Sequence, residues 1–115
     1  MTKRALPHLL RIKQSLEELA ALQSVAKETF LQDRLMQHAV SMLLFHVGEN
    51  LSQLRSLNQE EFSRAPESWH ELVGLRNIIA HGYQAIEPHR IWTYLQDDLD
   101  EFRDSVETAL DKIAN

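Results

Sequence analysis

The sequence predicts an all-α protein. Every long segment repeats its apolar residues at steps of three and four, the spacing of one helix face, and no stretch alternates apolar and polar residues convincingly enough to demand a strand. The 115 residues are 43% hydrophobic and include only three Gly and three Pro, a composition typical of a soluble globular protein. This length suits one domain, residues 1–115, with a single core.

The first half of the chain predicts two helices. One follows Pro7, a residue suited to a first helical turn, and carries an apolar stripe of Leu9, Ile12, Leu16, Leu19 and Leu22. Residues 24–28 predict a break. A longer helix, from about residue 31 to residue 54, carries the stripe Met36, Val40, Leu43, Val47, Leu51 and Leu54. Leu35, Ala39 and Met42 widen this apolar arc, which indicates packing on two sides.

The second half predicts two more helices. Residues 56–68 read as a connection with one short turn around residues 60–62, and a third helix runs from about residue 68 to residue 81. Gly82 occupies a position at which a residue in the left-handed conformation commonly ends a helix. Residues 84–87 connect it to the next helix, which we expect to begin at Pro88. The last helix has a narrow apolar seam formed by Trp92, Leu95, Leu99, Phe102, Val106, Ala109 and Ile113.

Composition excludes several classes of function. The chain has no cysteine, which rules out disulfides, Cys-ligated zinc, iron–sulfur clusters and thiol catalysis. No apolar run approaches the roughly 20 residues that span a bilayer, and the N-terminus lacks a secretion signal, so we expect a cytoplasmic protein with no membrane contact. Phosphate-cradling glycine loops and serine-hydrolase motifs are also missing.

The net charge of −5 is confined to the end of the chain. Residues 91–115 hold seven acids and two bases, whereas residues 1–90 hold ten of each. We interpret the acidic positions as the solvated back of the last helix and assign them no metal. His38 and His46 lack the companions of a metal site, and Trp69 and Trp92 fall on apolar stripes as packing residues. The distribution disfavours non-specific coating of nucleic acid but permits a locally positive cleft.

Composition and helical pattern conflict within residues 69–83. On an ideal helix, Arg76 falls in the middle of a contiguous apolar arc. An unpaired buried charge is very costly, so this arginine must reach a partner, extend to an edge or face an anion. Two interpretations carry equal weight: a structural ion pair, for example with Glu49, or an anion-binding role.

His81 follows Arg76 by five residues, which places it about 140° around the helix axis. Either the helix end unwinds at His81 and Gly82, or a second copy of the chain completes a shared cleft. A lone histidine at a helix C-terminus is more often a dipole partner than a catalyst. The surrounding polar groups, expected around the same end, are Asn77, Tyr83, His70, His89 and Arg90.

Residues 76–83 match the Arg-x4-His-x-Tyr signature of HEPN-domain proteins and most resemble the HepT-like branch, the toxin half of HepT/MntA toxin–antitoxin pairs. Further similarity covers residues 30–34, Gly48 and Glu49, the tryptophan before the motif helix, residues 91–92 and residues 97–99. Most of the chain is covered, and only the N-terminal helix is nondescript.

This resemblance implies an antiparallel bundle of four to five helices that forms a homodimer, with both motifs lining one cleft. It also implies an endoribonuclease that needs no metal or cofactor, in which the ribose 2'-hydroxyl attacks the adjacent phosphate and leaves a 2',3'-cyclic phosphate. In this interpretation His81 is the general acid or base and Arg76 stabilises the phosphate, with Asn77 in support. Arg90, His89 and His70 are possible RNA contacts.

The resemblance further implies a partner, an MntA-like nucleotidyltransferase that silences the toxin by transferring AMP to Tyr83. Two alternatives remain open at this point. In the first, the chain is a non-catalytic binding subunit of a nucleotidyltransferase complex. In the second, it is a helical dimer in which Arg76 forms only a structural ion pair.

Overall fold

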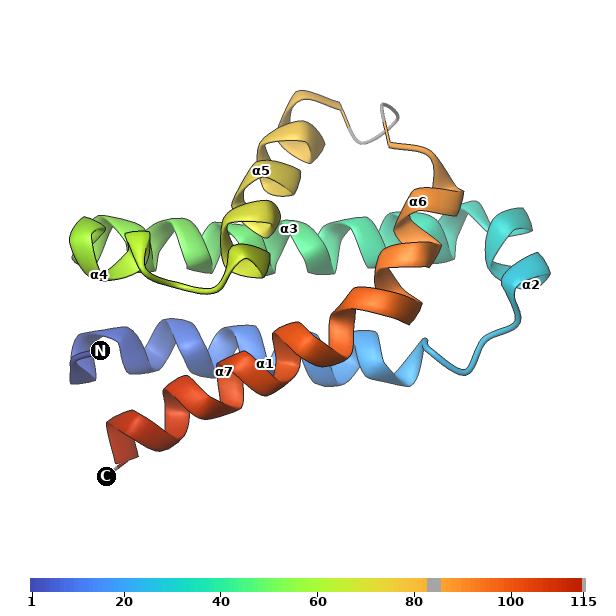
Figure 1. The fold of residues 1–115 in the computed structure, drawn as a ribbon. Coiled ribbons are helices and arrows are strands. Elements are labelled where there is room, and N and C mark those ends of the chain that lie inside the picture. Colours follow the sequence, from blue (N-terminus) through green and yellow to red (C-terminus); the bar gives the residue numbers. More distant parts are fainter. Residues whose placement is uncertain (83–85, 115) are drawn as a thin grey trace.

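The computed structural model describes residues 1–82 and 86–114, and all regular structure in these ranges is helical. The long helices are α1 (Leu6–Ala21), α3 (Arg34–Leu57), α5 (Glu67–Gly82) and α7 (Leu99–Ala114). The short elements are η1 (Lys3–Ala5), α2 (Lys27–Gln32), α4 (Gln59–Ser63), α6 (Pro88–Thr93) and the π-helical turn η3 (Tyr94–Asp98) (Figure 1). The all-α prediction is confirmed.

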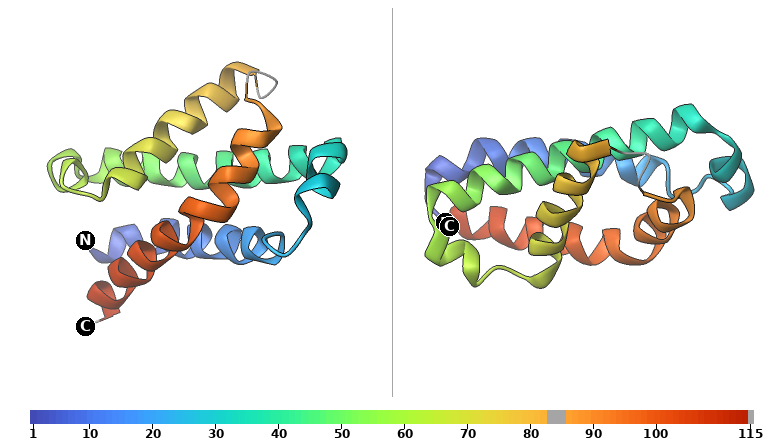
Figure 2. Two further views of the ribbon diagram at one scale, coloured as in Figure 1. Left: turned by 45° about the vertical axis from the view of Figure 1, so that its right-hand side comes forward. Right: turned by 90° about the horizontal axis from the view of Figure 1, so that it is seen from above.

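Helices α1, α3 and α7 form the main body. The first two run antiparallel and side by side, and α7 packs across α1 (Figures 1 and 2). Their inward faces are buried, and each fully buried aliphatic or aromatic side chain contributes about 1.5–3 kcal/mol. The buried residues include Leu9, Ile12, Leu16 and Leu19 of α1, Val40, Val47 and Leu51 of α3, and Leu99, Phe102 and Val106 of α7. All of these residues belong to the apolar stripes that the sequence predicts for the three helices.

Helix α5 leans out of this body. It crosses α3 steeply and its C-terminal end points away from α1 and α7, after which the chain returns through α6 (Figures 1 and 2). The first half of α5 is the anchored half, because Trp69, Leu72 and Val73 are buried there. The indole Nε1 of Trp69 donates a hydrogen bond to Ser105 Oγ at 2.8 Å. The predicted helix and the packing role of Trp69 are confirmed.

The long helix α3 begins later than the sequence predicts. The prediction of a break over residues 24–28 followed by one helix from residue 31 is wrong in detail, because a separate short helix occupies Lys27–Gln32. Asp33 then separates the two helices with an extended backbone, and its Oδ1 accepts a hydrogen bond from the Met36 backbone N–H at 3.0 Å. This N-cap fixes the start of α3, which continues to Leu57.

Three apolar residues in the first half of α3 are exposed. Leu35 is 80% exposed, Met42 is 53% exposed, and Ala39 is exposed as well. Their spacing of four and three residues places them in one row, which we call the α3 ridge. The sequence predicts that this side of α3 packs against another part of the protein. Within a single chain, the side is exposed to solvent.

The last helical stretch is not uniform. Pro88 opens α6 as predicted, but a π-helical turn over Tyr94–Asp98 separates α6 from α7. The seam continues through this turn, and its central residues Leu95 and Leu99 are fully buried. Trp92 packs on Phe30 of α2 with ring centroids 5.5 Å apart, which confirms its packing role.

Across residues 1–82 and 86–114, no helix combines the length and apolar character needed to cross a lipid bilayer. In the same ranges, no three His, Asp or Glu side chains are grouped so that they could share a metal ion. The acids of the last segment are mostly exposed, as expected of a solvated helix face.

Candidate functional site

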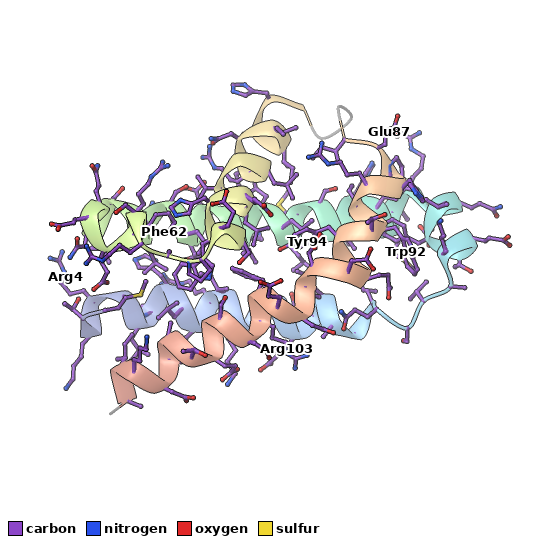
Figure 3. The ribbon with its side chains drawn as sticks, in the orientation of Figure 1. Arg4, Phe62, Glu87, Trp92, Tyr94 and Arg103 are labelled. Carbon is purple, nitrogen blue, oxygen red and sulfur yellow. The ribbon has the colours of Figure 1, made fainter. Side chains whose placement is uncertain are left out.

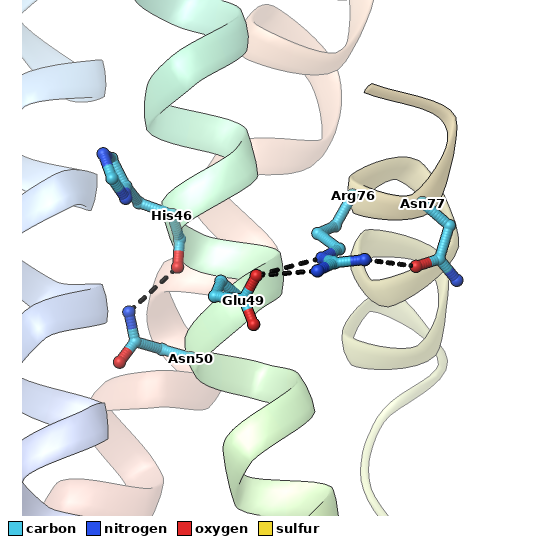
Figure 4. A network of polar contacts seen from close by, with 5 residues as sticks. All are labelled: His46, Glu49, Asn50, Arg76 and Asn77. Atoms are coloured by element: carbon cyan, nitrogen blue, oxygen red, sulfur yellow. Dashed lines mark hydrogen bonds and ion pairs between the residues drawn. The ribbon is translucent and has the colours of Figure 1, made fainter. Parts of the chain in front are cut away.

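Arg76 of α5 forms an ion pair with Glu49 of α3. Its Nη2 lies 2.8 Å and its Nε 3.2 Å from the same carboxylate oxygen, Glu49 Oε2 (Figure 4). The structure thus contains the ion pair that the sequence offered as one interpretation. The pair is only half-buried, however, since the two side chains retain 29% and 37% of their exposure. Arg76 is therefore both paired and accessible from solvent.

Two further contacts restrain the same guanidinium. Its Cζ lies 5.2 Å from the centroid of the Phe45 ring, within the range of a cation–π interaction. Its Nη1 donates a hydrogen bond to Asn77 Oδ1 at 3.0 Å (Figure 4). The supporting residue Asn77 thus contacts Arg76 directly. Phe45 was missed by sequence reasoning, although its position four residues before Glu49 places both on one face of the long helix.

Gly48 allows α5 to approach α3 closely at this point. A methyl group at Gly48 would collide with the Arg76 Cβ and lie 2.8 Å from the backbone oxygen of Leu72. Neither neighbour is the free end of a flexible side chain, so a larger residue would push α5 away from α3. The glycine therefore sets the position from which Arg76 reaches Glu49.

His81 occupies the last turn of α5 and is exposed. The following Gly82 has φ of +144°, a backbone conformation that favours glycine, which confirms the predicted helix end. Because α5 remains helical through both positions, Arg76 and His81 stay about 140° apart around the axis and about 7.5 Å apart along it. A single chain directs Arg76 toward α3 and His81 to another side of α5.

The remaining predicted site residues are dispersed. Tyr83 lies outside the described residues. His70 packs edge-on against Phe62, with ring centroids 5.0 Å apart, in the first half of α5. It is 11 residues from His81, about 16.5 Å along the helix, so the expectation that His70 joins the cations at the C-terminal end is wrong for a single chain. His89 and Arg90 are exposed on α6.

The described site therefore has two parts. A planar cation is held in place by a carboxylate, an aromatic ring and an amide, and an exposed imidazole lies about 1.4 turns further along the same helix. A restrained guanidinium binds anions such as phosphate with little reorganisation, and an imidazole exchanges protons near neutral pH.

The chain is similar in sequence to a known protein family and to two named proteins. The profile of the family described as Ribonuclease HepT-like matches residues 12–109. This match begins within α1 and ends within α7. The relative named "Putative RNase MJ1380", from Methanocaldococcus jannaschii, is 31% identical over 78 residues, covering 68% of this chain and 70% of that protein. The relative named "Putative RNase TTE0752", from Caldanaerobacter subterraneus subsp. tengcongensis, is 27% identical over 107 residues, covering 92% and 94% of the two chains.

No solved structure matches the chain significantly. The sequence match is nevertheless long, and it contains both the ion pair and the exposed histidine at the end of α5. The resemblance inferred from the residues is thereby confirmed at the level of the family and of its enzyme class. The chain belongs to the HepT-like ribonuclease family.

Proposed function

We propose that the protein is an endoribonuclease toxin that cleaves RNA without a metal ion. The 2'-hydroxyl of the ribose attacks the adjacent phosphorus, the bond to the 5'-oxygen of the next nucleotide breaks, and that oxygen takes up a proton. His81 moves the proton as general base or acid, and Arg76 stabilises the charge that develops on the phosphate oxygens. The observation that carries this proposal is the restrained, partly exposed guanidinium of Arg76 in a chain of this family.

Arg76 retains the capacity to bind a phosphate. A guanidinium has five N–H donors, and the three hydrogen bonds to Glu49 and Asn77 occupy three of them. The remaining donors and the exposed part of the side chain are available to an anion. Because Glu49, Phe45 and Asn77 already fix its plane, little side-chain entropy is lost when the phosphate binds.

The functional unit in this proposal is a homodimer. Arg76 and His81 of one chain face different sides of α5, so a cleft that contains both requires a second copy. The exposed α3 ridge supports this arrangement, because a row of apolar side chains on a stable monomer is unusual. Met42 and Glu49 are seven residues apart, so their directions around the axis of α3 differ by only about 20°. The α3 ridge and the ion pair therefore lie on the same side of α3.

The test is cleavage of RNA in the presence of a metal chelator. We expect products that end in 2',3'-cyclic phosphate, and we expect His81→Ala and Arg76→Ala each to lower the rate by about 100- to 10,000-fold. His46→Ala is the matched control, because His46 is another exposed histidine and points away from Arg76 in Figure 4. Full activity of His81→Ala, with an unchanged melting temperature, would remove the proposed acid or base.

Silencing by a nucleotidyltransferase partner is a separate part of the proposal. The Tyr83 hydroxyl would attack the α-phosphorus of ATP, forming a phosphodiester to AMP and releasing pyrophosphate. A bulky anion on Tyr83, two residues after His81 in the sequence, would repel RNA from the site. Intact mass spectrometry after incubation with ATP and a candidate nucleotidyltransferase should show adenylyl adducts that are lost in Tyr83→Phe. An adduct that persists in this variant contradicts the assignment.

Two observations favour a second function, a non-catalytic binding subunit of a nucleotidyltransferase complex. The Glu49 carboxylate already neutralises Arg76, and the chain as a whole carries a charge of −5. In that case expression of the chain without a partner should leave growth unaffected. Growth arrest that disappears in Arg76→Ala would reject this alternative and support the ribonuclease.

A further inference from the structure

A hollow separate from the ion pair lies between α5 and the segment formed by α6 and η3. It has a volume of about 570 Å³. This is within the range of pockets that hold small organic ligands. Its walls are mainly apolar and include Leu75 and Ile78 of α5 and Ile91 of α6. We call it the α5–α6 cleft.

Tyr94 places an unused hydrogen-bonding group in this cleft. Its hydroxyl oxygen is buried and has no hydrogen-bond partner within residues 1–82 and 86–114. The side chain belongs to the π-helical turn η3 and lines the cleft, between α5 and the end of α6 (Figure 3). A buried hydroxyl without a partner costs about 1–3 kcal/mol, and π-helical turns are frequent at functional sites. Both observations indicate a ligand.

Two carboxylates accompany the tyrosine. Glu71 of α5 and Asp98 of η3, both exposed, line the cleft. Burial, followed by the negative charges of Asp98 and Glu71, raises the pKa of Tyr94 well above its ordinary value. Like any tyrosine at neutral pH, Tyr94 carries a phenolic proton and can donate a hydrogen bond, and carboxylate oxygens can accept one. A matching ligand has a flat apolar body, at least one acceptor and several N–H donors.

Among the constituents of RNA, guanine matches this set best. Its ring presents the O6 and N7 acceptors, which suit a phenolic donor, together with the N1–H and N2–H₂ donors, which suit carboxylates. Adenine and cytosine each offer a single exocyclic amino group as donor, and uracil offers one ring N–H. The apolar walls would contact the two faces of the base.

We propose that the α5–α6 cleft binds a guanine base of the RNA substrate through Tyr94, Glu71 and Asp98. This inference rests on the proposed ribonuclease function and adds a base preference to it. Ile78 of the cleft and His81 are three residues apart, about 4.5 Å along α5, so the base would lie beside the reacting phosphate. Arg90, which also lines the cleft, can offset the repulsion between the carboxylates and the RNA backbone.

Methyl NMR of the isoleucines tests the proposal without requiring cleavage. The chain has six isoleucines, of which Ile78, Ile86 and Ile91 line the cleft, whereas Ile12 and Ile113 lie elsewhere and serve as internal references. Titration with guanosine monophosphate should shift the methyl signals of Ile78 and Ile91 and leave those of Ile12 and Ile113 unchanged. The adenosine, cytidine and uridine monophosphates should bind roughly tenfold more weakly or worse, because each leaves an acceptor or the phenol unpaired.

Matched variants identify the groups that read the base. Asp98→Asn and Tyr94→Phe should each weaken binding of guanosine monophosphate by roughly tenfold. Asp97→Asn, an exposed neighbour that does not line the cleft, should have no effect. Equal affinity for all four nucleotides, shifts confined to signals outside the cleft, or no shift at millimolar guanosine monophosphate would each overturn the inference.

Failure of this inference can be separated from failure of the proposed function. If the protein cleaves RNA with no preference for guanine and its cleft signals do not move, the cleft proposal fails and the ribonuclease stands. If guanosine monophosphate binds in the cleft but no RNA is cleaved, the base site stands and the proposed reaction fails.

Discussion

Helices α5 and α7 each contain 16 residues, yet they meet the rest of the chain in different ways. The residues of α7 separate into a narrow buried seam, represented by Leu99, Phe102 and Val106, and a mostly exposed acidic back. By contrast, α5 is apolar over much of its circumference, buries mainly its first half and carries Arg76 inside its apolar arc.

The difference separates two kinds of sequence pattern. In α7 the buried residues follow the apolar seam and the charged residues follow the exposed back, as the pattern predicts. In α5 a charge interrupts the apolar face, and the structure places an ion pair, a cation–π contact and a close helix crossing at that position. Places where sequence rules conflict are where function is expected, because a charge retained within an apolar arc needs a reason.

The largest expected effect contrasts one residue from each helix. Phe102 of α7 is fully buried, and Phe102→Ala should lower the free energy of unfolding by about 3–5 kcal/mol through lost burial and a cavity. Ile78 of α5 is 38% exposed, and Ile78→Ala should change the same quantity by less than about 1 kcal/mol. Urea unfolding measures both. Equal losses would mean that the second half of α5 is packed as firmly as α7.

The next effect concerns the crossing of α5 with α3. Gly48→Ala should destabilise the protein by about 1–3 kcal/mol, because the added methyl collides with Arg76 and the Leu72 backbone. Gly74→Ala is the matched control: this helical glycine has open space around it, so alanine should stabilise by about 0.5–1 kcal/mol. Opposite signs in thermal unfolding support the close crossing, and two stabilised variants would contradict it.

The smallest effect concerns the ion pair itself. Glu49→Gln should lower the free energy of unfolding by at most about 1 kcal/mol, since both partners are about one third exposed. Added salt should shrink the difference from the wild type. Glu107→Gln breaks the more exposed pair with Lys13, at 3.2 Å, and should cost still less. A loss of about 3–5 kcal/mol on Glu49→Gln would instead indicate a purely structural buried pair.

Much of the fold could be predicted because it depends on local periodicity. The stripes of α1, α3 and α7 are long enough for a three-and-four spacing to be unambiguous, and Gly82 and Pro88 mark helix boundaries by their backbone preferences. Arg76 could be singled out, and Glu49 named as its partner, because an arginine within an apolar arc requires an anion.

Other features could not be predicted because they depend on tertiary geometry or on short segments. Six residues are too few for periodicity to define α2, and the side-chain cap at Asp33 is not distinguishable by sequence from an ordinary surface aspartate. The role of Gly48 appears only when α5 crosses α3. The α5–α6 cleft brings together Glu71 and Asp98, which are 27 residues apart, and no local pattern connects them.

The π-helical turn at Tyr94–Asp98 also controls the rotation of the helix that precedes it. A wider turn accommodates one more residue than an α-helical turn of the same path, and each residue corresponds to about 100° of rotation. Removing one residue here would restore regular α-helix, but it would turn α6 by that angle relative to α7. Arg90 and Ile91 would each turn by about 100° relative to α5, so the number of residues in this turn, as much as their identity, determines what α6 presents to the rest of the molecule.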